Sequence, residues 1–147
     1  IEQVVPHDAP MILIDQLVEY SDESAACSVT ITPQSPFYNE QIEGVPSYIG
    51  IEYMAQCIAA KAGANELASG GDIKLGFLLG TRKYKPNVAF FSNGVTLKIK
   101  ATRLMEDAAG LSVFDCVIVA KDQEAVILAQ AKINVFQPEN SAAYVQE

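Results

Sequence analysis

One stretch, residues 44–60, decides the fold of this chain, and it reads GVPSYIGIEYMAQCIAA. Pro46 suits the first turn of a helix, and Ser47 can accept hydrogen bonds from the amide groups that a helix start leaves without partners. The residues that follow are apolar on nearly every side. We therefore expect a long helix that is covered by protein all round rather than one that lies on a surface.

Two polar side chains, Glu52 and Gln56, interrupt this apolar helix. They are four residues apart and so lie on one helix face, where the Gln56 amide could hydrogen-bond the Glu52 carboxyl. A carboxylate in apolar surroundings is costly unless it is paired, which makes Glu52 a candidate for proton transfer. The alternative is a glutamate placed near the helix start by the helix dipole alone.

The composition is that of an ordinary globular protein, with 147 residues that fit one domain over 1–147 and half of them hydrophobic. The formal net charge of −8 argues against nucleic acid as the main partner. Charged and polar residues break the longest apolar run, so we expect no membrane span. Cys27, Cys57 and Cys116 lack the spacing of a metal site or a disulfide frame. We expect buried, reduced thiols, a cytoplasmic location, no metal and no cofactor.

The periodicity predicts one helix among antiparallel strands. Strands are expected at residues 11–20, 25–32, 74–85, 95–102, 111–120 and 125–136, a helix at 47–67, a loop at 33–44 and a turn at 90–93. A single apolar helix needs cover, which a curved antiparallel sheet provides in part and a second subunit can complete. The expected fold class is therefore α+β, with the hot-dog architecture of a sheet curled around one helix. A different α+β roll with the same order of elements is the alternative.

Three motifs carry a resemblance to a known family, and they read PHDAPMILID at residues 6–15, GVPSYIGIEYMAQ at 44–56 and LLGTRKYK at 78–85. Together they resemble the 3-hydroxyacyl-acyl carrier protein dehydratases of the FabZ/FabA type, and in particular the branch found in aryl-polyene clusters. The resemblance implies hot-dog subunits in a homodimer or a dimer of dimers. It also implies elimination of water from a 3-hydroxyacyl thioester, carried on acyl carrier protein or coenzyme A, to give a trans-2-enoyl thioester.

In that family a loop histidine and a helix acid from different subunits transfer the protons. The resemblance places Glu52 at the acidic position and Ser47 where the family has a glycine, whose backbone N–H polarises the thioester carbonyl. The family's loop histidine falls on Tyr38, and the only histidine in this chain is His7. Either His7 takes the role, or Tyr38 works with Glu52, or the dehydration chemistry is lost. Gln56 and Gly80 complete the predicted substrate-binding set.

Basic residues gather in two predicted strands. Six of the ten lysines and arginines are Arg82, Lys83, Lys85, Lys98, Lys100 and Arg103. In an acidic protein this predicts a local positive patch, with Arg82, Lys83 and Lys85 docking an acidic acyl carrier protein. The alternative is the ordinary solvated face of two strands.

Three functions compete at this point. The first is a 3-hydroxyacyl thioester dehydratase that uses Glu52 and His7. The second is a hot-dog acyl thioesterase, in which an acidic residue on the same helix activates water and the missing histidine is not needed. The third is a non-catalytic dehydratase partner or acyl-binding subunit, which the absence of the loop histidine favours.

Overall fold

The computed structural model describes residues 13–21, 23–68 and 78–136. The elements in these ranges are β1 (Gln16–Tyr20), β2 (Ser24–Thr30), β3 (Gly44–Pro46), a 3-10 turn (Ser47–Ile49), α1 (Gly50–Ala68), β4 (Leu78–Pro86), β5 (Phe90–Ser92), β6 (Thr96–Glu106), β7 (Leu111–Ala120) and β8 (Gln123–Phe136). Among the described helices, none combines the length and the hydropathy needed to cross a bilayer.

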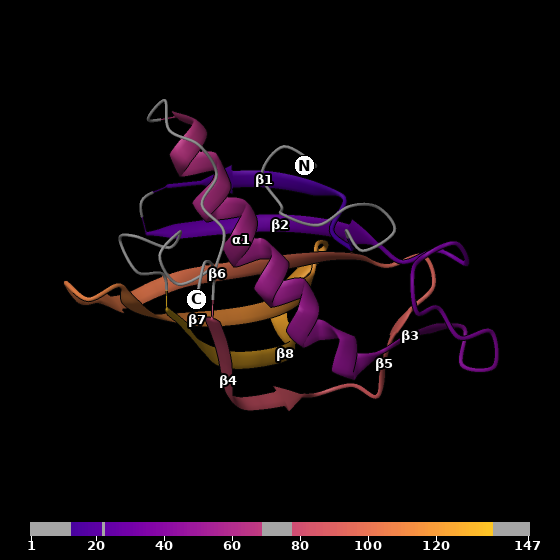
Figure 1. Ribbon diagram of the computed structural model, residues 1–147. Helices are drawn as coiled ribbons and strands as arrows, with labels where there is room; N and C mark the ends of the chain where they lie inside the picture. The colour runs from indigo at the N-terminus through magenta and orange to yellow at the C-terminus, as the bar shows by residue number, and fades with distance from the viewer. Residues whose placement is uncertain (1–12, 22, 69–77, 137–147) are drawn as a thin grey trace, which may run out of the picture.

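Six strands form one antiparallel sheet in the order β1-β2-β6-β7-β8-β4, and α1 crosses one of its faces (Figure 1). This arrangement confirms the expected hot-dog fold. The core lies between helix and sheet, where Tyr53 and Met54 of α1 are almost fully buried with Ile99 and Ile118 of the sheet. Burying a side chain of this size contributes roughly 1.5–3 kcal/mol, so the helix face against the sheet holds much of the stability.

The sheet covers one face of α1, in line with the expectation that the sheet provides only part of the cover. The covered face carries the buried residues Tyr53, Met54, Gln56, Cys57, Ile58, Ala60 and Lys61. The rest of the helix surface carries the half-buried residues Ile51, Glu52, Ala55, Ala59 and Ala62, and Glu52 lies at its border with the covered face, beside Gln56. This part of the helix surface is mostly apolar, and its residues are less buried than those that face the sheet.

The first strand begins at Gln16 and is shorter than the predicted 11–20, of which residues 11 and 12 lie outside the described part of the chain. Leu13 and Ile14 are both buried, which breaks the alternation of a strand with one exposed face. The Leu13 N–H leaves the strand ladder and donates to the side chain of Gln56 instead.

The predicted turn at residues 90–93 is wrong, because residues 90–92 form β5, which pairs with β3 just before the helix. Gly44 allows this pairing to be close, since a Cβ there would lie 2.7 Å from the Phe90 side chain and against the Phe91 carbonyl. The same pairing leads directly into the helix start. There Pro46, rather than Ser47, is the capping residue, and no side chain caps the turn.

A β-bulge interrupts β4 between Arg82 and Lys85, so that Lys83 and Tyr84 together face a single residue of β8. Lys83 has φ = 55°, in the left-handed region that bulges often use. Figure 1 shows β4 bending sharply along its length. The bend turns the second half of the strand toward the helix start.

Candidate active site

Glu52 lies in the first turn of α1, on the helix face that the sheet leaves half-exposed. One turn later the Gln56 side chain is completely buried and donates from Nε2 to Glu52 Oε1 at 3.3 Å. The hydrogen bond expected from their spacing is therefore confirmed. The Glu52 side chain is thus partly exposed and is held on one side by the Gln56 amide.

The Gln56 amide has a fixed orientation, because its Oε1 accepts a hydrogen bond from the Leu13 N–H at 2.7 Å. With Oε1 committed to a donor, the NH2 group must face Glu52. This contact also brings the chain before β1 to the side of α1 that carries Glu52. His7 is six residues before Leu13 and lies outside the described residues, so its catalytic role stays a prediction.

The helix start is not arranged as the family resemblance predicted. The Ser47 N–H, expected to polarise a thioester carbonyl, donates to the Ala89 carbonyl at 3.0 Å. The Ser47 carbonyl accepts from the Gly50 N–H and from the Tyr84 hydroxyl. The amide of Ser47 is thus occupied by a structural hydrogen bond, because the segment between β4 and β5 runs beside the helix start.

Tyr84 contacts the helix start, and the sequence does not predict this contact. Its side chain is half-buried, and burial raises the pKa of its phenol to about 12. The hydroxyl therefore remains a proton donor throughout the neutral range. The only signal in the sequence was an aromatic residue between two lysines, which is equally typical of an edge strand.

Tyr38, which stands at the position of the family's loop histidine, is half-buried and packs against the core. It helps line a cavity of about 530 Å³ that is open to solvent beside the helix start. The lining residues are Phe37, Tyr38, Asn39, Glu40, Gln41, Pro46 and Tyr48. Phe37 and Tyr48 are 55% and 65% exposed, so this cavity presents aromatic surface next to the first helical turn.

Gly80, the remaining predicted substrate-binding residue, lies exposed in β4 opposite Asn134 of β8. A Cβ at Gly80 would meet the Asn134 Cβ only at 4.0 Å, so close packing does not require a glycine here. Its assignment to substrate binding stays a prediction.

The predicted six-residue basic patch is wrong as a single patch, because β7 and β8 separate its two strands. On β6, Lys98 and Lys100 lie 3.6 and 2.7 Å from the carboxylate of Glu124, and Arg103 lies 3.1 Å from Glu106. These three cations are engaged by acidic partners on their own sheet. They lie away from the β4 cations.

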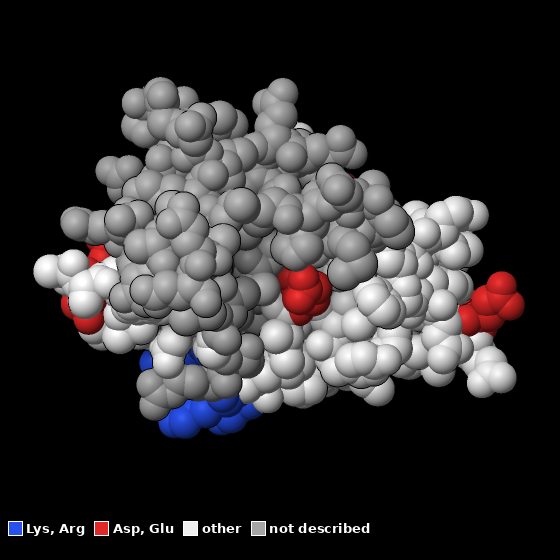
Figure 2. Space-filling model, in the orientation of Figure 1, with Lys and Arg blue, Asp and Glu red and all other residues white. Residues whose placement is uncertain are grey.

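A separate basic edge lies on the neighbouring strands β4 and β8, and it consists of Lys83, Lys85 and Lys132. All three lysines are exposed, and Lys132 of β8 pairs in register with Arg82. Figure 2 shows basic side chains gathered below the bend of β4. The docking role predicted for Arg82, Lys83 and Lys85 stays a prediction.

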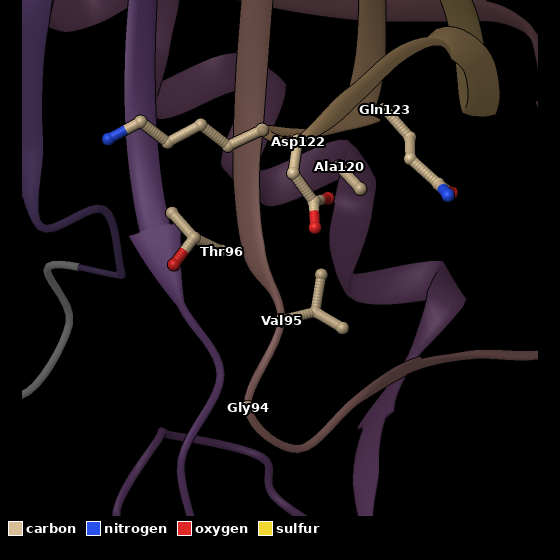
Figure 3. A pocket seen from close by; sticks show the side chains of 7 residues that line it. Gly94, Val95, Thr96, Ala120, Asp122 and Gln123 are labelled. Carbon is tan, nitrogen blue, oxygen red and sulfur yellow. The ribbon is translucent and has the colours of Figure 1, made fainter.

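A second open cavity, of about 640 Å³, lies where the β7–β8 turn meets the start of β6 (Figure 3). The side chains of Val95 and Asp122 point toward one another across it. It contains none of the residues predicted for catalysis, and α1 does not line it.

The three cysteines are buried in the core, on β2, α1 and β7. The pKa of the Cys57 thiol is raised by its hydrogen bond with Cys27 and by burial, and burial raises that of Cys116 to about 12. The Cys57 and Cys116 thiols are therefore protonated at neutral pH, and all three cysteine side chains are buried. Within the described ranges, no three His, Cys, Asp or Glu residues are grouped so as to hold a metal ion.

Comparison with known proteins identifies the family of this chain. Residues 1–146 match the sequence profile of the ApeP-like family, described as ApeP dehydratase. The chain belongs to this family. A similar curated protein is the 3-hydroxyacyl-[acyl-carrier-protein] dehydratase FabZ of Streptococcus equi subsp. zooepidemicus, 33% identical over 86 residues, which are 58% of this chain and 61% of that protein. The chain thus spans about three fifths of the length of the curated relatives it matches.

Solved structures extend the likeness to nearly the whole ApeP-like chain. The Dehydratase Heterocomplex ApeI:P from Xenorhabdus doucetiae contains a chain that is 26% identical, with a TM-score of 0.85 over 99% of this chain and 96% of that one. An uncharacterised protein from Pyrococcus horikoshii is 12% identical, with a TM-score of 0.66 over 95% and 94% of the two chains. The second likeness concerns the fold alone.

Proposed function

We propose that this protein is a subunit of a dehydratase that converts a 3-hydroxyacyl thioester, carried on acyl carrier protein, to the trans-2-enoyl thioester. The observation that carries the proposal is the Glu52 carboxyl, half-exposed in an apolar helix and held by Gln56. Family membership and the FabZ relatives support the same reaction class. Glu52 lies in the first turn of α1, where a thioester could approach the helix.

The reaction breaks the C2–H and C3–O bonds, forms the C2=C3 double bond and releases water. It therefore needs one group that removes the C2 proton and one that protonates the departing hydroxyl. We assign one of these two roles to Glu52. For the other, His7 is the only histidine that this chain can offer.

We infer that a second hot-dog subunit completes the site. The half-buried face of α1, with Ile51, Ala55 and Ala59, has the apolar character of a surface that another subunit covers. A relative of this chain is found in a dehydratase heterocomplex, which favours a partner of the same fold with a different sequence. Such a partner would supply the histidine that Tyr38 replaces, whereas a homodimer would depend on His7.

The basic edge of Lys83, Lys85 and Lys132 is the proposed docking surface for the acidic acyl carrier protein. In a chain of net charge −8, a localised positive surface can steer an acidic partner. Changing Lys83 and Lys85 to Glu should raise KM for the carrier-bound substrate several-fold at low salt, and added salt should reduce the difference. Lys121→Glu, at an exposed position in the β7–β8 turn, is the control, and an equal effect there would contradict the assignment.

The test of the reaction is an assay with a 3-hydroxyacyl thioester, using the protein alone and with a co-purified hot-dog partner. Wild type should form the enoyl thioester, and Glu52→Gln should lower kcat at least about 100-fold, the usual contribution of a general acid or base. Glu19→Gln, at an exposed position on β1, should behave as wild type. Release of free thiol would indicate a thioesterase instead. No product under either condition would indicate an acyl-binding subunit without activity.

A further inference from the structure

Tyr84 reaches from β4 to the start of the helix, where its hydroxyl donates to the Ser47 carbonyl. The raised pKa, near 12, keeps that proton on the phenol. The same carbonyl also accepts the Gly50 N–H. A carbonyl oxygen has two lone pairs, and here a tyrosine on one side and the helix backbone on the other engage both.

Two sequence features are needed to bring the Tyr84 hydroxyl to this carbonyl. The bulge at Lys83 turns Tyr84 toward the helix while Lys83 and Lys85 remain exposed. Gly50 leaves the space that the hydroxyl occupies, because a Cβ at Gly50 would lie against the Tyr84 oxygen and 3.1 Å from Ile118 Cδ1. Neither a regular strand nor a larger residue at the helix start would permit the contact.

The contact controls the peptide group between Ser47 and Tyr48. A trans peptide is planar, and its N–H points away from its C=O. Holding the Ser47 carbonyl therefore sets the direction of the Tyr48 N–H, on the side of the peptide opposite Tyr84. Hydrogen bonds accepted by the carbonyl also polarise the peptide, which makes its N–H a stronger donor.

Of the Ser47 and Tyr48 amides, the Tyr48 N–H is the one that can donate to a ligand. The Ser47 N–H is engaged by Ala89, whereas the early amides of a helix have no acceptor within the helix. Tyr48 also lines the open cavity of about 530 Å³ beside the helix start. Glu52 follows Tyr48 by four residues, so donor and carboxyl are one turn apart on the same helix face.

We propose that Tyr84 is a positioning residue that fixes and polarises the Ser47–Tyr48 peptide, so that the Tyr48 N–H binds the thioester carbonyl oxygen. The inference rests on the proposed dehydratase function. In the reaction, removal of the C2 proton places negative charge on that oxygen, and a fixed amide donor stabilises the charge without having to reorient. Tyr84 acts through the peptide and does not itself touch the substrate.

The test compares Tyr84→Phe with wild type and with Tyr20→Phe, a control at an exposed position on β1. Loss of the Tyr84 hydroxyl should lower kcat by about 10- to 100-fold, as expected for a misplaced oxyanion donor, and should change KM less than twofold. In the 1H–15N spectrum the Tyr48 amide resonance should move upfield, because the Ser47 carbonyl of the same peptide group has lost the hydrogen bond from Tyr84. Tyr20→Phe should leave kcat and this resonance unchanged.

A second variant keeps the test valid if Tyr84→Phe folds poorly. Gly50→Ala keeps the Tyr84 hydroxyl in the protein but displaces it from the Ser47 carbonyl. This variant should therefore lower kcat by a similar factor. The double variant Gly50→Ala/Tyr84→Phe should lower kcat by less than the product of the two single effects, because both changes break the same contact between Tyr84 and Ser47. An active wild type whose kcat is unaffected by Tyr84→Phe overturns this inference alone. A wild type that forms no enoyl product overturns the proposed function, and the inference falls with it.

Discussion

Gln56→Glu offers the sharpest test of the amide that holds Glu52. The substitution keeps the size of the side chain and the oxygen that accepts the Leu13 N–H. It replaces the donating NH2 group, 3.3 Å from Glu52 Oε1, with a second carboxyl oxygen. Two carboxylates at about 4 Å repel by roughly 4 kcal/mol at an effective dielectric constant of 20, and one of them must take up a proton to relieve this.

The sign of the pH dependence follows from linkage. In the unfolded chain the introduced carboxyl titrates near pH 4.3, and repulsion raises its pKa in the folded protein. The variant should match wild type below about pH 4 and lose stability as the pH rises through the raised value. The expected loss at about pH 8 is on the order of 4 kcal/mol.

The assay is urea unfolding of both proteins from about pH 4 to pH 8, with Gln34→Glu as a control at an exposed position. Gln56→Leu serves as a second comparison. It leaves the buried Leu13 N–H without its acceptor and should cost about 1–3 kcal/mol with no such pH dependence. If the difference between Gln56→Glu and wild type were the same at every pH, the Gln56 amide would not face Glu52.

Three further predictions concern stability and reactivity. Gly44→Ala should lower the free energy of unfolding by about 1–3 kcal/mol, because its Cβ meets Phe90 and the Phe91 carbonyl, whereas Gly80→Ala should not, and thermal unfolding of the two measures this. Lys100 and Lys98 lower the pKa of the Glu124 carboxyl, so that carboxyl contributes stability that is lost as the pH falls through its folded pKa. Glu124→Gln should therefore make unfolding less sensitive to acid, and an unchanged acid midpoint would contradict this. A thiol reagent such as Ellman's should modify none of the three buried cysteines in the native protein and all three in guanidinium.

Local patterns predicted the helix and several strands well, because those elements depend on neighbouring residues. The strand at 111–120 has the expected bounds, and the helical spacing of Glu52 and Gln56 predicted their hydrogen bond. The sequence predicts a turn where β5 lies, because three residues carry no periodicity and the partner strand β3 is more than forty residues away in the chain. The contact of Tyr84 with Ser47 is not predicted for the same reason, because it joins two residues that are 37 positions apart in the chain.

The parts of the site that could not be predicted depend on contacts between distant segments. The Leu13 N–H that orients Gln56 comes from before the first strand. The engagement of the Ser47 amide by Ala89 depends on how β5 docks beside the helix. Chemistry-bearing residues were therefore recognisable from their type and spacing, but which of their donors are occupied was decided by tertiary pairing.

The bulge in β4 makes the length of this strand a constraint on the chain. Side chains of a strand alternate between its two faces, and the extra residue at Lys83 resets that alternation. Deleting one residue here would turn Tyr84 outward and a lysine inward. The number of residues between Gly80 and Pro86 therefore determines whether the sheet edge reaches the helix start through Tyr84.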